Sequence, residues 1–270
     1  MAAGEAGSGG AEALTGAAAY EPYVGRWSRL IARDFLAWLA IPAGARWLDV
    51  GCGTGALSAA ILAQAAPSEV LGVEPLAERV AYARAQVRDP RARFEEGDAQ
   101  ALPYAAGSFD AVVSGLVLNF VPDPRQALAE LARVARSGGT VAVYVWDYAG
   151  EMQLMRHFWD AAVALDPNAL ELDEGRRFPL CQPGPLADLF HGVGLRAVEV
   201  RAVDVPTVFR DFDDYWTPFL GGQGPAPSYA MSLDAERRAA LRERLRARLP
   251  VQPDGSIQLT ARAWAARGQR

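Results

Sequence analysis

A cluster of glycines between two apolar segments constrains the fold of this chain more than any other part of its sequence. The run ARWLDV at 45–50 leads into Gly51, Gly53 and Gly55, and the helix-forming run ALSAAILAQAA follows directly. Glycine allows the backbone to turn sharply and allows a ligand to approach more closely than a Cβ would permit. The unpaired N–H groups at the start of a helix favour a bound carboxylate or phosphate. The sequence therefore predicts a strand, a ligand-binding turn and a helix.

The alternation of strands and helices continues along the first half of the chain. The predicted strands of this pattern span 45–50, 69–74, 91–98, 109–118 and 140–146. Such alternation indicates a parallel, doubly wound α/β sheet, because right-handed crossovers place helices on both of its faces. Residues 196–205 and 256–266 are also strand-like, and the second of these segments alternates between apolar and polar side chains.

Length and composition indicate a single domain that carries insertions. At 270 residues the chain is too short for two full-sized domains. The Gly/Ala-rich residues 1–19 are predicted to be a flexible extension, and residues 20–270 to form one domain. Helical and irregular segments at about 147–183 and 206–250 interrupt the strand–helix pattern. We interpret them as helical insertions that cap the sheet.

Net charge, cysteine spacing and hydropathy argue against nucleic acid, metal and membrane as partners of this chain. The net charge of −5 disfavours a nucleic-acid partner. The two cysteines, Cys52 and Cys181, lack metal-ligand spacing, so neither a metal site nor a disulfide is predicted. No apolar run approaches the roughly 18 residues of a membrane span, and the N-terminal residues do not resemble a signal peptide. These features predict a cytoplasmic protein with no membrane partner.

The glycine turn by itself fits two classes of cofactor. Gly51, Gly53 and Ala56 satisfy the G-x-G-x-x-A pattern of dinucleotide-binding folds. Glu74, at the end of the second strand, could accept hydrogen bonds from both hydroxyls of a ribose in either class. Asp98-Ala99 after the third strand is placed to read an adenine edge, and the fourth strand leads into LNFVPDP instead of a nicotinamide-site pattern. An NAD-dependent oxidoreductase therefore stays the less favoured alternative.

Four segments, taken in the order of the chain, carry a family resemblance. WLDVGCGTG, VEP, GDAQALPYAAGSFDAVVSGLVLNFVPDP and RVARSGGTVAV, within about residues 44–146, resemble a class I S-adenosyl-L-methionine (SAM)-dependent methyltransferase. The chain is similar to the small-molecule branch that includes ubiquinone/menaquinone-biosynthesis methyltransferases. The resemblance implies a Rossmann-like, seven-stranded, mostly parallel sheet whose last strand is antiparallel.

The resemblance also has implications for activity. It implies SAM as the cofactor, S-adenosyl-L-homocysteine as the product and an unidentified small molecule as the methyl acceptor. A non-catalytic sensor or scaffold that binds SAM or S-adenosylhomocysteine is the alternative, because a fold does not fix a function. The sequence indicates neither the acceptor atom nor the oligomeric state.

The resemblance places cofactor contacts along the first four strands. The implied cofactor-binding positions are Asp49, Gly51, Cys52, Gly53, Gly55, Glu74, Pro75, Leu76, Asp98, Ala99, Leu116 and Asn119. Asp49 would support the turn. Gly51, Gly53 and the backbone around them would receive the methionine part, and Glu74 would hold the ribose. Cys52 lies inside the turn, and we expect its side chain to fill space because it lacks an activating partner.

The remaining positions would surround the adenine and the sulfonium. Pro75 or Leu76 would pack against the adenine ring, while Asp98 with Ala99 would contact the adenine amine. Residues 116–119 would line the pocket beneath the sulfonium. Relatives commonly carry histidine where this chain has Asn119, so any assistance from Asn119 must come through hydrogen bonding.

Residues before the first strand are further candidates. In similar methyltransferases this region folds over the cofactor, and here it contains Tyr20, Tyr23 and Trp27. Aromatic faces also suit a sulfonium cation. Arg26 and Arg29 are candidates for the methionine carboxylate.

The chemistry itself makes limited demands on the protein. Methyl transfer from a sulfonium is an in-line displacement, so proximity and exclusion of water supply most of the catalysis. A general base is needed when the acceptor carries a proton, and it should lie beyond the carboxyl ends of the strands. Asp147 and Tyr148 directly follow the fifth strand, and His157 lies about one helix away. These three residues are the candidates for that role.

Overall fold

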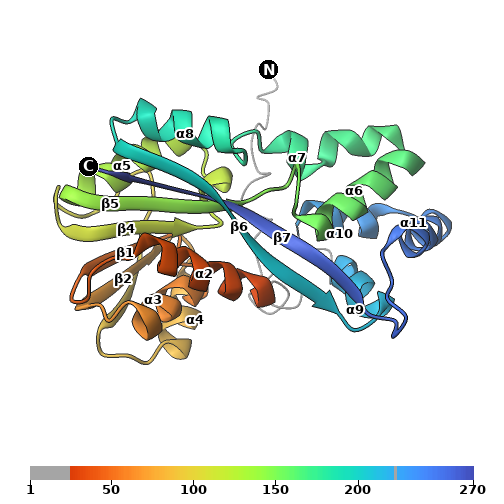
Figure 1. The fold of residues 1–270 in the computed structure, drawn as a ribbon, viewed down its shortest axis with the longest axis horizontal. Helices are drawn as coiled ribbons and strands as arrows, with labels where there is room; N and C mark the ends of the chain where they lie inside the picture. The colour runs from red at the N-terminus through yellow and green to blue at the C-terminus, as the bar shows by residue number, and fades with distance from the viewer. Residues whose placement is uncertain (1–24, 222–223) are drawn as a thin grey trace, which may run out of the picture.

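The structure, a computed structural model, describes residues 25–221 and 224–270, except for the side chain of Arg26. Seven strands form one sheet in the order β3-β2-β1-β4-β5-β7-β6 (Figure 1). The strands are β1 Arg46–Val50, β2 Glu69–Glu74, β3 Ala92–Glu96, β4 Phe109–Gly115, β5 Ala135–Trp146, β6 Arg196–Phe209 and β7 Ile257–Gln269. Strands β1 to β5 pair in parallel, and β7 lies antiparallel between β5 and β6. The predicted α/β sheet, with its antiparallel last strand, is confirmed.

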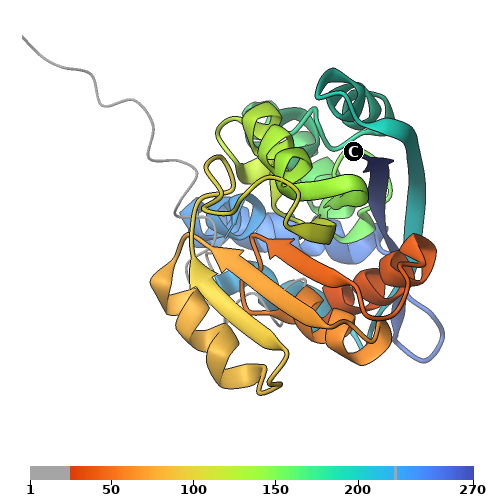
Figure 2. The same cartoon turned by 90° about the vertical axis from the view of Figure 1, so that its left-hand side faces the viewer.

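Helices cover both faces of the sheet, as the view in Figure 2 shows. On one face α2 (Arg26–Leu39) contacts α3 (Ala56–Gln64), and on the other α5 (Pro124–Val134) contacts α8 (Pro183–Gly192). Helix α4 (Ala77–Gln86) contacts β2 and β3. Within the described ranges no helix is both long and apolar enough to cross a membrane.

The central strands form the middle of the core. Leu48 of β1 pairs in register with Val112 of β4, which pairs in turn with Val141 of β5. All three side chains are fully buried. Burying a side chain of this kind stabilises the folded state by roughly 1.5–3 kcal/mol. The buried central strands therefore hold the loops at the carboxyl edge of the sheet in place.

A group of helices lies at the end of the sheet toward which β4 points (Figure 1). Its members are α6 Gln153–Leu165, the 3-10 helix η4 Pro167–Leu172, α7 Glu174–Arg177, α9 Phe212–Trp216, η5 Thr217–Gly221, α10 Pro225–Ser232 and α11 Ala235–Arg248. Aromatic rings hold this group together: Phe158 stacks on Phe219 with centroids 4.5 Å apart, and Trp159 lies 5.6 Å from Tyr229. These elements occupy the segments predicted as cap insertions, although the division of the chain into domain and cap stays a prediction.

Two strands differ from their predicted bounds at positions that matter for the site. β4 ends at Gly115 instead of residue 118, because Leu116 takes a φ of +61° and Leu118–Phe120 form a 3-10 helix, η3. β5 begins at Ala135 instead of residue 140, because Phe109 pairs with Ala135 before an irregularity shifts the register. Both differences arise from pairing and backbone conformation that hydropathy does not encode.

Candidate functional site

The glycine turn after β1 lies against the end of β2. The Gly51 N–H donates to the Val73 carbonyl at 2.7 Å. Gly51, Gly53 and Gly55 have φ values of +73°, +54° and +85°, in the left-handed region that glycine adopts without the cost of a Cβ. At Gly51 a Cβ would lie 2.6 Å from Val117 Cγ1, whereas at Gly53 it would meet no described heavy atom within 4 Å. The backbone at Gly53 therefore permits the close approach that a ligand requires.

Asp49 is a buried carboxyl group beneath this turn. It is 1% exposed, and its Oδ2 accepts a hydrogen bond of 2.7 Å from the Ser58 hydroxyl on α3. Burial raises the pKa of Asp49 to about 7, although the Ser58 hydrogen bond opposes that rise. This contact ties the end of β1 to the helix that follows the turn. Sequence patterns did not single out Ser58, although a hydroxyl in the first turn of that helix is a usable signal.

The Cys52 side chain is buried. Its side chain belongs to a small apolar cluster with Val80, Ala83 and Phe94. Burial, with Asp49 and Glu74 nearby, raises the pKa of the Cys52 thiol well above its usual range. A thiol in such surroundings stays protonated and is a poor nucleophile.

Glu74 ends β2 and connects the first two turns. It is 3% exposed; its Oε2 accepts a hydrogen bond of 3.2 Å from the Gly53 N–H, and its Oε1 accepts one of 3.4 Å from the Leu76 N–H. Arg79 Nη1 lies 3.8 Å from the same Oε1. Burial raises the pKa of Glu74, and Arg79 and the two N–H groups oppose that rise. Pro75 is exposed beside it.

Asp98 and Ala99 lie in the loop after β3, next to the end of β2. The Gly97 N–H donates to the Glu74 carbonyl at 3.2 Å, which holds this loop against β2. The Asp98 side chain is exposed, and its Oδ1 accepts a hydrogen bond of 2.9 Å from the Gln100 N–H. Ala99 is half-buried.

The end of β4 supplies an unpaired donor. The Leu116 N–H donates to the Tyr144 carbonyl at 2.8 Å, which fixes the positive-φ residue against β5. Three residues later, Asn119 Nδ2 is buried and has no hydrogen-bond partner in the described part of the chain. Buried polar atoms are nearly always paired, so an orphaned one indicates a place where a ligand or water can bind. The groups after β1, β2, β3 and β4 thus gather at the carboxyl edge of the sheet, where α/β sheets bind ligands.

Comparison with known sequences identifies the family of this chain. A family model described as a methyltransferase domain matches residues 48–143. Methyltransferase GfsG of Streptomyces halstedii is 38% identical over 200 residues, which cover 70% of this chain and 68% of that protein. The chain belongs to the SAM-dependent methyltransferase family.

The methyltransferase has further relatives. It is similar to trans-aconitate 2-methyltransferase of Deinococcus radiodurans, with 34% identity over 182 residues that cover 64% of this chain and 66% of that protein. The chain spans only 39 to 57% of the length of several other curated relatives.

Solved structures share the fold. Phosphoethanolamine N-methyltransferase 2 of Haemonchus contortus, solved with phosphomonomethylethanolamine and S-adenosylhomocysteine, superposes with a TM-score of 0.57 at 16% identity. The superposition covers 93% of this chain and 56% of that one.

The three general-base candidates of the methyltransferase lie in two places. Asp147 is buried directly after β5, and its Oδ2 accepts a hydrogen bond of 2.9 Å from the Glu151 N–H. Tyr148 is also buried, with its ring 5.6 Å from that of Phe178. His157 lies on α6, half-buried, where burial lowers its pKa, Arg248 of α11 lowers it further, and the neighbouring carboxylate of Asp160 opposes both. The structure therefore keeps Asp147 and Tyr148 together and turns His157 toward α11.

The N-terminal candidates are only partly described. Tyr20 and Tyr23 lie outside the described residues, as does the side chain of Arg26. Trp27 is 3% exposed and packs edge-to-face on Phe209 of β6, with centroids 5.1 Å apart. This contact packs the start of α2 against β6, the edge strand, and places the Trp27 side chain in the core.

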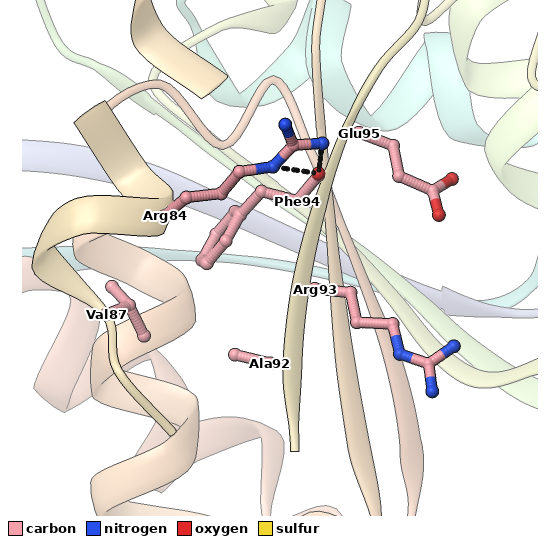
Figure 3. Close-up of a pocket in the computed structure, with 6 residues that line it drawn as sticks. All are labelled: Arg84, Val87, Ala92, Arg93, Phe94 and Glu95. Carbon is pink, nitrogen blue, oxygen red and sulfur yellow. Dashed lines mark hydrogen bonds between the residues drawn. The ribbon is translucent and has the colours of Figure 1, made fainter. Parts of the chain in front are cut away.

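A separate pocket of about 350 Å³ lies at the outer edge of the sheet (Figure 3). Its lining comes from α4, the residues after it and β3: Arg84, Val87, Ala92, Arg93, Phe94 and Glu95. Arg84 donates from Nε and Nη2 to the Phe94 carbonyl, at 3.0 and 2.6 Å, and so covers part of the edge strand. None of the predicted site residues lines this pocket.

Proposed function

We propose that this methyltransferase binds SAM at the carboxyl edge of its sheet and transfers the methyl group to a small molecule. The observation that carries the proposal is the open backbone at Gly53 beside the buried carboxylate of Glu74. An adenosine-containing ligand with a charged amino-acid part requires both features: a close backbone approach and a carboxylate that can accept ribose hydroxyl hydrogen bonds. The relative named for trans-aconitate supports a small acceptor.

The chemistry of the described residues supports this cofactor. Gly51 and Gly53 would receive the methionine part, because a Cβ at Gly53 would meet no heavy atom of the described residues within 4 Å. Glu74 would hold the ribose hydroxyls, and Asp98 with Ala99 would contact the adenine amine from the loop held against β2. Asn119 Nδ2 would complete its hydrogen bonding with an acceptor atom of the ligands.

The reaction requires little chemistry from the protein. SAM, when bound, supplies a methyl group already activated by the positive sulfur. The protein must hold the acceptor in line and keep water out. We expect the cap helices and the loop after β5 to do this. For an acceptor that carries a proton, Asp147 and Tyr148 are the candidates to remove it.

Two experiments test the proposal as a whole. In calorimetric titrations, SAM and S-adenosylhomocysteine should bind, and NAD should not. When the protein is incubated with SAM and fractionated metabolite extracts, mass spectrometry should detect a metabolite that has gained one methyl group. Absence of binding by both adenosyl ligands would refute the cofactor assignment. Binding with no methylated product from any extract would instead favour a sensor or scaffold.

Glu74→Ala and Asp98→Ala should weaken SAM binding without unfolding the protein. A hydrogen bond to a charged group contributes about 1.5–3 kcal/mol, so each change should raise the dissociation constant by about 10- to 100-fold. Isothermal titration calorimetry measures the change, and thermal unfolding checks the fold. Asp89→Ala, beside the opposite end of β3, is the matched control and should bind normally. Unchanged affinity in both test variants would remove the ribose and adenine assignments.

Asp147→Asn should leave SAM affinity unchanged and lower turnover. Asparagine retains an oxygen that can accept from the Glu151 N–H, so the loop after β5 should keep its shape. It cannot take up a proton, and loss of general-base assistance typically slows a reaction by about 10²- to 10⁴-fold. The rate of product formation in the extract assay measures this effect. Wild-type turnover in the variant would exclude Asp147 as the base.

A further inference from the structure

Arg79 occupies a position that helix electrostatics disfavours. It is the third residue of α4, which begins at Ala77. The first turn of a helix carries partial positive charge, so a cation there is destabilising unless another group compensates for it. Glu78 lies in the same turn, and the buried partner of Arg79 is Glu74, whose Oε1 lies 3.8 Å from Arg79 Nη1. The side chains of the pair are only 12% and 5% exposed.

The surroundings of Glu74 explain why a cation is needed there. Asp49 of β1, itself a buried carboxyl, lies close enough to interact electrostatically with Glu74. Cys52 of the glycine turn also interacts with it, and Glu96 of β3 pairs with Glu74 in register. Burial favours the protonated form of Glu74, and an ionised Asp49 would favour it too, whereas the Cys52 thiol is neutral. Arg79 and the backbone N–H groups of residues 53 and 76 favour the charged form.

We propose that Arg79 is a positioning residue for the cofactor, which keeps the Glu74 carboxylate charged and oriented to accept the two hydroxyl hydrogen bonds of a ribose. The inference rests on the proposed function, because the ribose in question is that of SAM. A charged acceptor makes shorter and stronger hydrogen bonds than a neutral carboxyl group. An ionised carboxylate offers about four lone-pair sites, and two backbone N–H groups use part of them, so acceptor capacity remains for a ligand.

The proposal gives Arg79 a pH-dependent effect on affinity. Ligand binding requires ionised Glu74, so affinity is constant at high pH and falls as Glu74 takes up a proton. Burial raises the pKa of Glu74 and Arg79 lowers it. Without Arg79, Glu74 should therefore begin to take up a proton at a higher pH. The loss of affinity in an Arg79 variant should therefore be small at high pH and larger toward acidic pH.

Calorimetric titration with S-adenosylhomocysteine, from about pH 6 to about pH 9, tests this. Arg79→Met should bind about 10-fold more weakly than wild type near pH 7, and its decline in affinity should start at higher pH. Arg79→Lys keeps the charge and should stay within about threefold of wild type. Arg88→Met, just beyond the end of α4, should follow the wild-type profile. In a Glu74→Gln background Glu74 no longer titrates, whereas Asp49 still does, and Arg79→Met should not alter the pH profile that remains.

The outcomes separate this inference from the proposed function. If wild type binds neither S-adenosylhomocysteine nor SAM, the proposed function fails. If wild type binds and the Arg79→Met profile superposes on it, only the role of Arg79 fails. An equal loss at every pH that Arg79→Lys does not rescue would indicate a steric role and also overturn the inference. Thermal unfolding monitors folding, and Arg79→Gln, which keeps a polar side chain, replaces methionine should that variant unfold.

Discussion

Arg156→Met is expected to lower the free energy of unfolding by about 3 kcal/mol, because it leaves a buried carboxylate without its cation. Arg156 donates from Nη1 and Nη2 to the two Asp173 oxygens, at 3.0 and 2.6 Å. The Asp173 side chain is 6% exposed, and Arg156 Nη1 also donates to the Tyr148 carbonyl at 3.0 Å. One side chain thus joins α6, the start of α7 and the loop after β5. Urea denaturation followed by circular dichroism measures the loss.

Arg176→Met is the matched control for this prediction. Arg176 pairs with Glu171 at the surface, and losing such a pair should change the unfolding free energy by less than about 1 kcal/mol. The double variant Arg156→Met/Asp173→Asn should recover much of the lost stability, because it removes both charges and keeps an acceptor for the Gly175 N–H. An Arg156→Met protein as stable as the control would show that the buried pair does not stabilise the cap.

Glu174→Gln is expected to stabilise the protein above about pH 7, by up to about 3 kcal/mol. Glu174 is 2% exposed and accepts a hydrogen bond from Trp159 Nε1. Burial raises the pKa of this carboxyl from 4.5 to about 7, although the Trp159 hydrogen bond and Arg177 oppose the rise. Between these two pH values the folded protein holds a proton that the unfolded chain releases. Stability from this group is therefore greatest below about pH 4.5, falls as pH rises, and levels off above about pH 7.

Glutamine removes the titration and retains an acceptor for the indole N–H. The stability gained over wild type should therefore increase from about pH 5 to about pH 8, as measured by denaturant unfolding at each pH. Asp49 titrates in the same range in both proteins, so the comparison isolates Glu174. Glu171→Gln changes an exposed carboxylate nearby and should show no such trend. A gain that is equal at every pH would contradict the raised pKa.

The sheet could be predicted because its signals are local. Strands β1 and β2 are short apolar runs that end at a glycine or an acidic residue, and helix-forming segments follow them at once. The bounds of β4 and β5 could not be predicted, because Leu116 takes a conformation unusual for leucine and Ala135 pairs across an irregular register. Both the backbone conformation of Leu116 and the pairing of Ala135 depend on neighbouring strands, so the hydropathy pattern does not reveal them.

Part of the candidate site could also be predicted from the sequence. Residue type and spacing predict the turn glycines and Glu74. Few residues other than glycine suit the turn, and few other than an acidic residue can accept two ribose hydrogen bonds. Arg79 was missed because one arginine on a helix rich in charge looks like a surface residue until its carboxylate partner is seen. The contact of Arg156 with Asp173 joins separate elements of the cap, and sequence spacing does not reveal such contacts.

The position of β7 determines the order in which the sheet can be completed during synthesis. β6 ends at Phe209, but its neighbour in the sheet, β7, spans Ile257–Gln269. β6 therefore emerges from the ribosome long before the strand that links it to β5 has been made. Strands β1 to β5 can assemble among themselves while the ribosome continues translating, whereas the hydrogen-bonding edge of β6 stays exposed in the nascent chain.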